Sequence, residues 1–278
     1  MKRYEEKMEK FTEGRKIQNP KLIMTVYWLL RLSVVLTMVI QAFQRDYQNV
    51  FICLLTLILF MLPTIIERKL HIDLPDVLEV VILLFIFAAD ILGEIRSFYV
   101  LVPHWDTALH TINGFLFAAI GFCIVDIFNQ EKKISFNLSP LYMAIAAFCF
   151  SMTIGVLWEF FEWAMDVWFG FDMQKDTVLN SISSVTLHPQ GLNEPVVMEQ
   201  IQNVIVVHQD GTQQTMNVGG YLDIGLQDTM KDLLVNLIGA VVFSVIGFFY
   251  IKTRGQGRIA KHFIPTVMEQ ENKEAPFF

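Results

Sequence analysis

The chain has 278 residues, of which 54% are hydrophobic and 18% are charged. Its apolar residues form runs of about 20, which excludes an ordinary soluble domain because such a run matches the ~30 Å hydrocarbon core of a bilayer. The net charge of −7, with no basic stripe outside the loops, argues against a nucleic-acid partner. The sequence therefore predicts an all-α membrane protein.

Six apolar segments in chain order predict a bundle of about six transmembrane helices. They cover residues 22–43, 50–66, 77–95, 105–128, 141–169 and 224–251. The polar segment 1–21 is too long and too acidic for the start of a cleavable signal peptide, so we expect it to be a cytoplasmic tail. The predicted domains are this tail (1–21), helices one to five (22–169), an extracytoplasmic insertion (170–220), helix six (221–252) and a second tail (253–278).

The distribution of Lys and Arg predicts the orientation of the helices. Basic residues concentrate in the two tails, in the loop between the second and third segments, and in the loop between the fourth and fifth. The opposite side carries only Arg45, Arg96, Lys175 and Lys231. Because positively charged loops stay inside, both termini are predicted to be cytoplasmic, which requires an even number of crossings of the plasma (inner) membrane.

The polar insertion at 170–220 is predicted to be rich in β-strands. Residues 185–187, 196–198, 204–208 and 215–218 are β-prone, and Gln-Asp-Gly-Thr at 209–212 is typical of a hairpin turn. The segment is too short for us to expect a core of its own.

Polar side chains of four predicted helices fall at one depth, near the headgroups of the outer leaflet. They are Asp90, Glu94 and Arg96 in the third segment, Asp106, His110 and Asn113 in the fourth, Glu159, Glu162 and Asp166 in the fifth, and Asp228, Lys231, Asp232 and Asn236 in the sixth. In the last three helices, the acids, amides and histidine recur every three or four residues, which places each set on one helix face.

Such carboxylates repel one another at a low-dielectric boundary, so they require protons, basic partners or a bound cation. Nearby basic groups are few, namely Arg96 and Lys231, and no partner is predicted for Arg31 in the first helix. Mixed Asp, Glu and His ligands suit Zn, Mn or Fe better than Ca. The ordinary alternative is that charged residues near helix ends simply reach the interface.

The metal-site hypothesis assigns a role to each of these residues. The predicted metal ligands are Asp106, His110, Glu162, Asp228 and Asp232, and the predicted catalytic carboxylates are Glu159 and Asp166. The remaining polar pocket is predicted to contain Asp90, Glu94, Arg96, His104, Asn113, Lys231 and Asn236.

Three sequence strings resemble the YjdF-like bacterial inner-membrane proteins. They are residues 104–114 (His-Trp-Asp-Thr-Ala-Leu-His-Thr-Ile-Asn-Gly), 158–166 (Trp-Glu-Phe-Phe-Glu-Trp-Ala-Met-Asp) and 228–239, which begins Asp-Thr-Met-Lys-Asp and ends Asn-Leu-Ile-Gly. The last string is also weakly similar to the final helix of VanZ-like proteins. The resemblance implies a small polytopic membrane protein and implies no particular activity.

Three classes of function are compatible with this pattern. A metal at the polar level would activate water against a lipid or lipid-linked ester or phosphoester in the outer leaflet. Alternatively, the intramembrane acids would serve a proton or cation transporter, or the insertion would bind an outside partner in a non-catalytic sensor or scaffold. The sequence specifies neither a substrate nor an oligomeric state.

Overall fold

The computed structural model describes residues 20–70, 72–130, 138–253, 263–264 and 266–267, so the predicted tails lie almost wholly outside the described residues. The chain divides into two compact units. The first contains Met1–Gly155 and Val235–Phe278, and the second contains Val156–Leu234. The helices α8 (Pro140–Phe169) and α9 (Leu226–Lys252) each continue without a break from one unit into the other.

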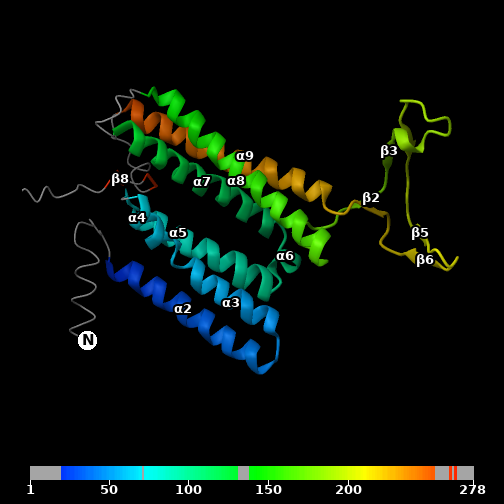
Figure 1. Cartoon of the computed structure of the whole chain (residues 1–278), viewed down its shortest axis with the longest axis horizontal. Coiled ribbons are helices and arrows are strands. Elements are labelled where there is room, and N and C mark those ends of the chain that lie inside the picture. The colour runs from blue at the N-terminus through cyan, green and yellow to red at the C-terminus, as the bar shows by residue number, and fades with distance from the viewer. Residues whose placement is uncertain (1–19, 71, 131–137, 254–262, 265, 268–278) are drawn as a thin grey trace, which may run out of the picture. The chain divides into compact units, whose positions relative to one another are not determined.

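The first unit is helical. Its remaining helices are α2 (Pro20–Phe43), α3 (Tyr47–Leu59), α4 (Leu62–Leu70), α5 (Asp76–Phe87), the π-helix η1 (Ala88–Ile95), α6 (Phe98–Leu101) and α7 (Trp105–Gln130). Figure 1 shows α2 and α3 as a helical hairpin, and Asp46 begins α3 by accepting a hydrogen bond from the Asn49 backbone N–H. The strands β1 (Ile72–Asp73) and β8 (Thr266–Val267) pair antiparallel.

Five helical segments among the described residues are long and apolar enough to cross a membrane. They are Met24–Phe43, Tyr47–Lys69, Trp105–Asp126, Pro140–Phe169 and Leu226–Lys252. Helices suit hydrocarbon because every backbone polar group within a helix interior is satisfied inside the segment. The protein is therefore a multi-pass membrane protein, as its composition predicts.

Two predicted helices have irregularities that the hydrophobic runs do not show. The segment predicted at 50–66 turns at Phe60 and Met61, between α3 and α4. Pro63 explains this break, because it has no N–H to continue the hydrogen-bond ladder of α3. The segment predicted at 77–95 is an α-helix for its first part and the π-helix η1 for its second.

Apolar clusters hold the first unit together. One cluster gathers buried residues of α2, α3, α5 and η1, among them Val34, Cys53 and Leu78. The other joins α7, α8 and α9 through residues such as Phe122, Met143 and Phe243. In the second group, α7 and α9 approach so closely that a Cβ atom at Gly114 would overlap the carbonyl oxygen of Asn236, and one at Gly239 would overlap that of Thr111.

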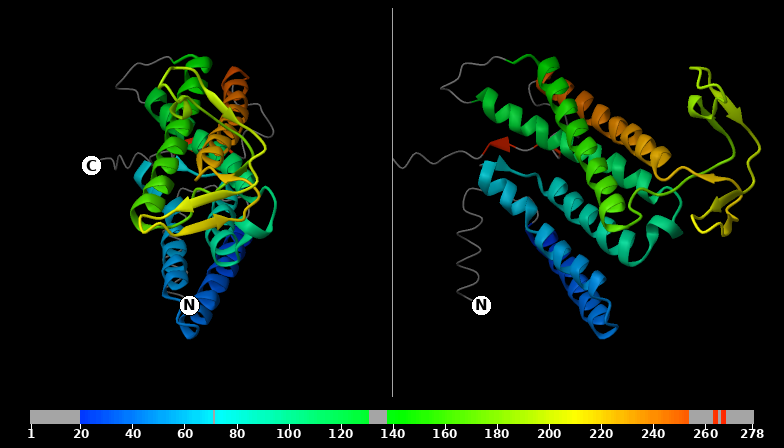
Figure 2. Two further views of the ribbon diagram at one scale, coloured as in Figure 1. Left: turned by 90° about the vertical axis from the view of Figure 1, so that its right-hand side faces the viewer. Right: turned by 45° about the vertical axis from the view of Figure 1, so that its right-hand side comes forward.

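The second unit contains the ends of α8 and α9 and the strand-rich insertion. Its strands are β2 (Val178–Leu179), β3 (Ile182–Ser184), β4 (Val196–Met198), β5 (Val204–Val207), β6 (Gln213–Met216) and β7 (Tyr221–Leu222). They pair antiparallel as β2–β7, β3–β4 and β5–β6, which are separate two-stranded ribbons (Figure 2). The predicted small β-rich insertion is therefore present.

Individual elements of the insertion test the sequence prediction. The β5–β6 hairpin confirms the predicted turn: Gly211 has a φ of 84°, and the His208 N–H donates to the Thr212 carbonyl. The prediction of a strand at 185–187 is wrong, because Val185–Leu187 forms the short 3₁₀-helix η2. The Ser184 hydroxyl oxygen accepts the Thr186 N–H and starts this turn, which is a local alternative to continuing the strand.

Candidate functional site

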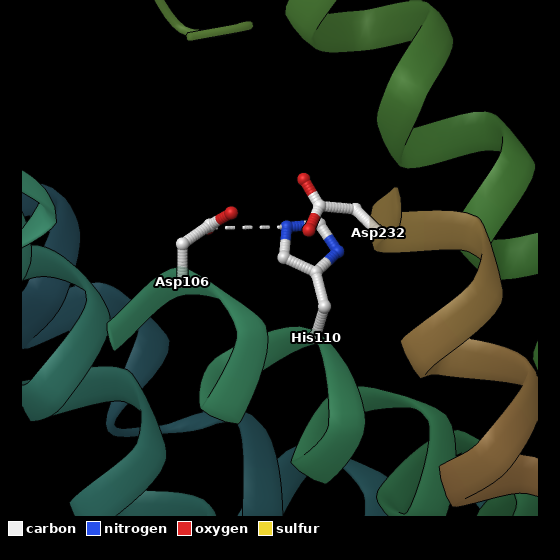
Figure 3. Close-up of side chains that lie close together, drawn as sticks. All are labelled: Asp106, His110 and Asp232. Carbon is white, nitrogen blue, oxygen red and sulfur yellow. Dashed lines mark ion pairs between the residues drawn. The ribbon is translucent and has the colours of Figure 1, made fainter. Parts of the chain in front are cut away.

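Asp106 and His110 form an ion pair on the first two turns of α7. The Asp106 Oδ1 atom lies 3.4 Å from the His110 Nε2 atom. The dashed line in Figure 3 marks this ion pair. His110 is only 8% exposed, and Asp106 is partly buried. A carboxylate against one ring nitrogen fixes the orientation and tautomer of an imidazole, which leaves the other nitrogen to bind a ligand. His104, in contrast, is exposed before the start of α7 and has a φ of 62°.

Asn113 and Asn236 form the next polar layer of the first unit. The Asn113 Nδ2 atom donates to Asn236 Oδ1 at 3.5 Å, and Asn236 is 1% exposed. On α8, a Cβ atom at Gly155 would lie 2.6 Å from Asn236 Nδ2, so this glycine makes room for the amide. Asn236 thus lies where α7, α8 and α9 meet, and its partners account for its burial.

Ser151 supports the same junction and was not predicted from the sequence. Its hydroxyl donates to the Gly114 carbonyl oxygen at 2.7 Å and is fully buried between α8 and α7. A serine in an apolar helix four residues before a glycine is a weak signal, because most such hydroxyls bond within their own helix.

Asp90 lies apart from these residues in the sequence and bonds to α3. The Thr56 hydroxyl donates to Asp90 Oδ2 at 2.8 Å, and Thr56 is completely buried. Asp90 belongs to the π-helix η1, a geometry that often occurs at functional positions. The other predicted polar residues of this segment, Glu94 and Arg96, are exposed.

Arg31 has an aromatic neighbour in its own helix. Its guanidinium carbon lies 4.3 Å from the centre of the Tyr27 ring, one turn earlier in α2. This cation–π contact offers one explanation for a charged side chain in the middle of an apolar helix.

The carboxylates at the end of α8 have two different kinds of environment in the second unit. Glu159 and Glu162 are 4% and 8% exposed, and Glu162 Oε1 accepts the Trp158 indole N–H at 2.9 Å. Asp166 instead binds the following loop, because its two oxygens accept the backbone N–H groups of Met173 and Gln174. Asp166 therefore anchors the chain where it leaves α8.

The first turns of α9 also carry one acid that binds the backbone of a loop, Asp228, and one buried acid, Asp232. Asp228 Oδ2 accepts the Lys175 backbone N–H at 2.9 Å. The Lys231 Nζ atom lies 3.6 Å from Asp228 Oδ1 and 4.0 Å from Asp232 Oδ1. Asp232 is only 1% exposed, whereas the Lys231 side chain is 47% exposed, so the lysine extends from a buried acid toward the surface.

Asp223 is a structural residue that the sequence analysis missed. Its oxygens accept the backbone N–H groups of Thr177, Gly225 and Gln227, and it is 7% exposed. The sequence does contain a signal for this role, because Asp-Ile-Gly directly before a helix is typical of a capping turn. In the structure, Gly225 has a φ of 93°.

Two acids of the insertion have shifted pKa values. Burial raises the pKa of Asp176, and the negative charges of Asp172, Asp223 and Asp166 raise it further, against the opposing effect of Lys175. Hydrogen bonds from the Thr212 hydroxyl and backbone N–H lower the pKa of Asp210 in the β5–β6 turn. The acids near Asp176 thus give it negatively charged surroundings.

Residues 26–253 match the family model described as "Predicted membrane protein (DUF2238)". The chain belongs to the DUF2238 family. No curated protein and no solved structure is significantly similar to it. The family match agrees with the multi-pass architecture and is consistent with the resemblance to YjdF-like proteins.

The matched part of this DUF2238 chain includes every predicted site residue from Asp90 to Asn236. Within the first unit, the structure brings Asp106 to His110 and Asn113 to Asn236. Within the second, it brings Lys231 to Asp228 and Asp232.

Proposed function

We propose that this DUF2238 protein binds a divalent transition metal, Zn, Mn or Fe, and uses it to hydrolyse a lipid or lipid-linked substrate. The observation that carries the proposal is the buried Asp106–His110 pair, an imidazole already oriented by a carboxylate. The proposed ligands are Asp106, His110, Glu162 and Asp232, which are four of the five ligands predicted from the sequence. Three of these side chains are drawn in Figure 3.

Helical register supports this choice of ligands. Asn113, Asn236 and Gly155 meet at one level of the first unit. His110 lies one turn before Asn113 on α7, Asp232 one turn before Asn236 on α9, and Glu159 one turn after Gly155 on α8. Each of the three helices thus carries a residue of the proposed site one turn away from the asparagine layer.

The donor types fit a transition metal. A buried imidazole with several carboxylates suits Zn, Mn or Fe, and such an ion acidifies a bound water and polarises an ester or phosphoryl oxygen. Glu159 is the proposed general base because it is a buried carboxyl group on α8, one turn after Gly155. Asp166 and Asp228 are proposed to shape the site by holding residues 173–175.

The proposed topology has six crossings. Five of them are the apolar segments described above. The additional crossing, third in chain order, is the continuous run of α5 and η1, residues 76–95, whose 20 residues match one bilayer crossing. With six crossings and the Lys and Arg bias of the loops, both termini are cytoplasmic. The proposed metal site then lies at outer-leaflet depth in the plasma (inner) membrane.

Metal content of the purified, detergent-solubilised protein tests the proposal. We expect about one tightly held Zn, Mn or Fe per chain, lost in His110→Ala, because a site with one imidazole depends on it. His104→Ala is the matched control and should keep its metal, since His104 is exposed. A metal-free wild-type protein that also fails to bind added Zn, Mn and Fe would contradict the proposal, as would equal metal content in His110→Ala.

Turnover is tested separately from binding. Release of water-soluble product from radiolabelled bacterial lipids should be metal-dependent and should be lost in Glu159→Gln. Unchanged product release after chelation would contradict metal-dependent hydrolysis.

Asp90 favours a second candidate function, transport of protons or cations. A carboxyl group hydrogen-bonded to Thr56 in a π-helical part of the membrane region has the properties of an ion-pathway residue. Flux into liposomes that Asp90→Asn abolishes would support transport, and the absence of flux in the wild type would exclude it.

A further inference from the structure

A groove opens between the first turns of α8 and the last turns of α9, and neither the proposed metal site nor the bundle core uses it. Its volume is about 470 Å³, within the range of small-molecule sites. Its walls are Leu141, Ile145 and Phe148 on α8 and Val241, Val245 and Phe249 on α9. All of these residues belong to the first unit.

The groove faces the surroundings of the helices and not the interior of the bundle. Leu141, Ile145, Val245 and Phe249 are each about half exposed, whereas Ala144 at its floor is 7% exposed. These walls belong to segments apolar enough to span a membrane. The medium at the opening is therefore the hydrocarbon of the bilayer.

The length of the groove matches one leaflet. Residues 141–148 of α8 and 241–249 of α9 extend for about 10–12 Å at 1.5 Å per residue. Half of a hydrocarbon core is about 15 Å thick, so the groove runs along most of one leaflet. A single acyl chain has this length and this chemistry.

Lys252 supplies a positive charge beside the groove. Its Nζ atom lies 5.6 Å from the centre of the Phe248 ring, and Phe248 lines the groove. Lys252 is exposed in the last turn of α9, where a phosphate headgroup would lie above an inserted chain. The charge is complementary to an anionic lipid.

We propose that this groove binds one acyl chain of an anionic phospholipid, whose headgroup phosphate contacts Lys252. The walls favour a lipid chain over the helix of a second copy, because helices in membranes associate through small residues. The exposed walls here are Leu, Ile, Val and Phe, and the two small lining residues, Ala144 and Ser244, are buried.

Native mass spectrometry of the full-length protein, with phosphatidylglycerol or phosphatidylcholine added in detergent, tests this proposal. We expect one retained phosphatidylglycerol and a preference of about fivefold over phosphatidylcholine, the effect of one lysine near a headgroup. Lys252→Gln should lose this preference. Lys69→Gln, which removes an exposed lysine at the end of α4, is the matched control and should keep it.

Filling the groove separates chain binding from headgroup binding. Val245→Phe, at a half-exposed wall position, and Ala144→Phe, at the floor, should both remove the retained lipid. Ala42→Phe at an exposed position of α2 should not. Lipid retention unchanged in a folded Val245→Phe protein would overturn the proposal. So would a wild-type dimer that dissociates on this substitution without loss of lipid, since a second copy would then occupy the groove.

Discussion

Asp106 on α7 and the acids that flank the insertion have different partners. Asp106 faces the His110 side chain, whereas Asp166, Asp223 and Asp228 accept backbone N–H groups. A carboxylate occupied by backbone donors holds a loop, and one paired with an imidazole remains suited to a metal. Spacing alone does not distinguish these two roles, because the loop donors come from residues distant in the sequence.

The largest expected loss of stability comes from an acid that holds a loop. Asp223→Ala removes the acceptor of three backbone N–H groups, and we expect the free energy of unfolding to fall by about 3 kcal/mol. Thermal unfolding in detergent measures this change. Asp172→Asn, at an exposed position, is the control and should have little effect. A stability loss no greater than that of the control would show that these bonds do not hold the loop.

Asp106→Asn should weaken metal binding by about 10- to 100-fold. The variant lacks the carboxylate that orients His110 and that would supply a negatively charged ligand. Competition with a chromogenic chelator measures the affinity. Asp106→Asn affinity equal to that of the wild type would place the metal elsewhere.

Asp166 tests whether the two roles are separable. Asp166→Ala should lower stability by about 1–2 kcal/mol through its two lost backbone bonds, while the bound metal is kept. Unfolding curves and metal content of the same preparation give both values. Metal loss without destabilisation would reverse the assignment and make Asp166 a ligand.

The smallest effect concerns the dependence of stability on pH. The raised pKa of Asp176 means that its proton is held more tightly in the folded protein. Its contribution to stability is present below the pKa of the unfolded chain and is lost as pH rises through the folded pKa. Asp176→Asn should therefore flatten the stability profile above about pH 4, the ordinary pKa of an unfolded aspartate. A profile identical to that of the wild type would show that neither burial nor the neighbouring acids shift the pKa of Asp176.

The sequence predicts the membrane helices well and the local irregularities poorly. The run predicted at 141–169 corresponds to α8 at Pro140–Phe169, because apolar length alone decides a membrane helix. The π-helix η1 and the 3₁₀-helix η2 depend on local hydrogen bonds and packing that hydrophobicity does not encode. Helical spacing likewise finds Asp106 and His110 but does not separate them from Asp166, whose role depends on the path of the following loop.

X-ray absorption spectroscopy of the purified protein identifies the ligands of the bound metal. We expect nitrogen and oxygen ligands at about 2.0–2.2 Å from the metal, including one imidazole whose signature disappears in His110→Ala. A shell containing sulfur, or an imidazole signature that persists in His110→Ala, would contradict it.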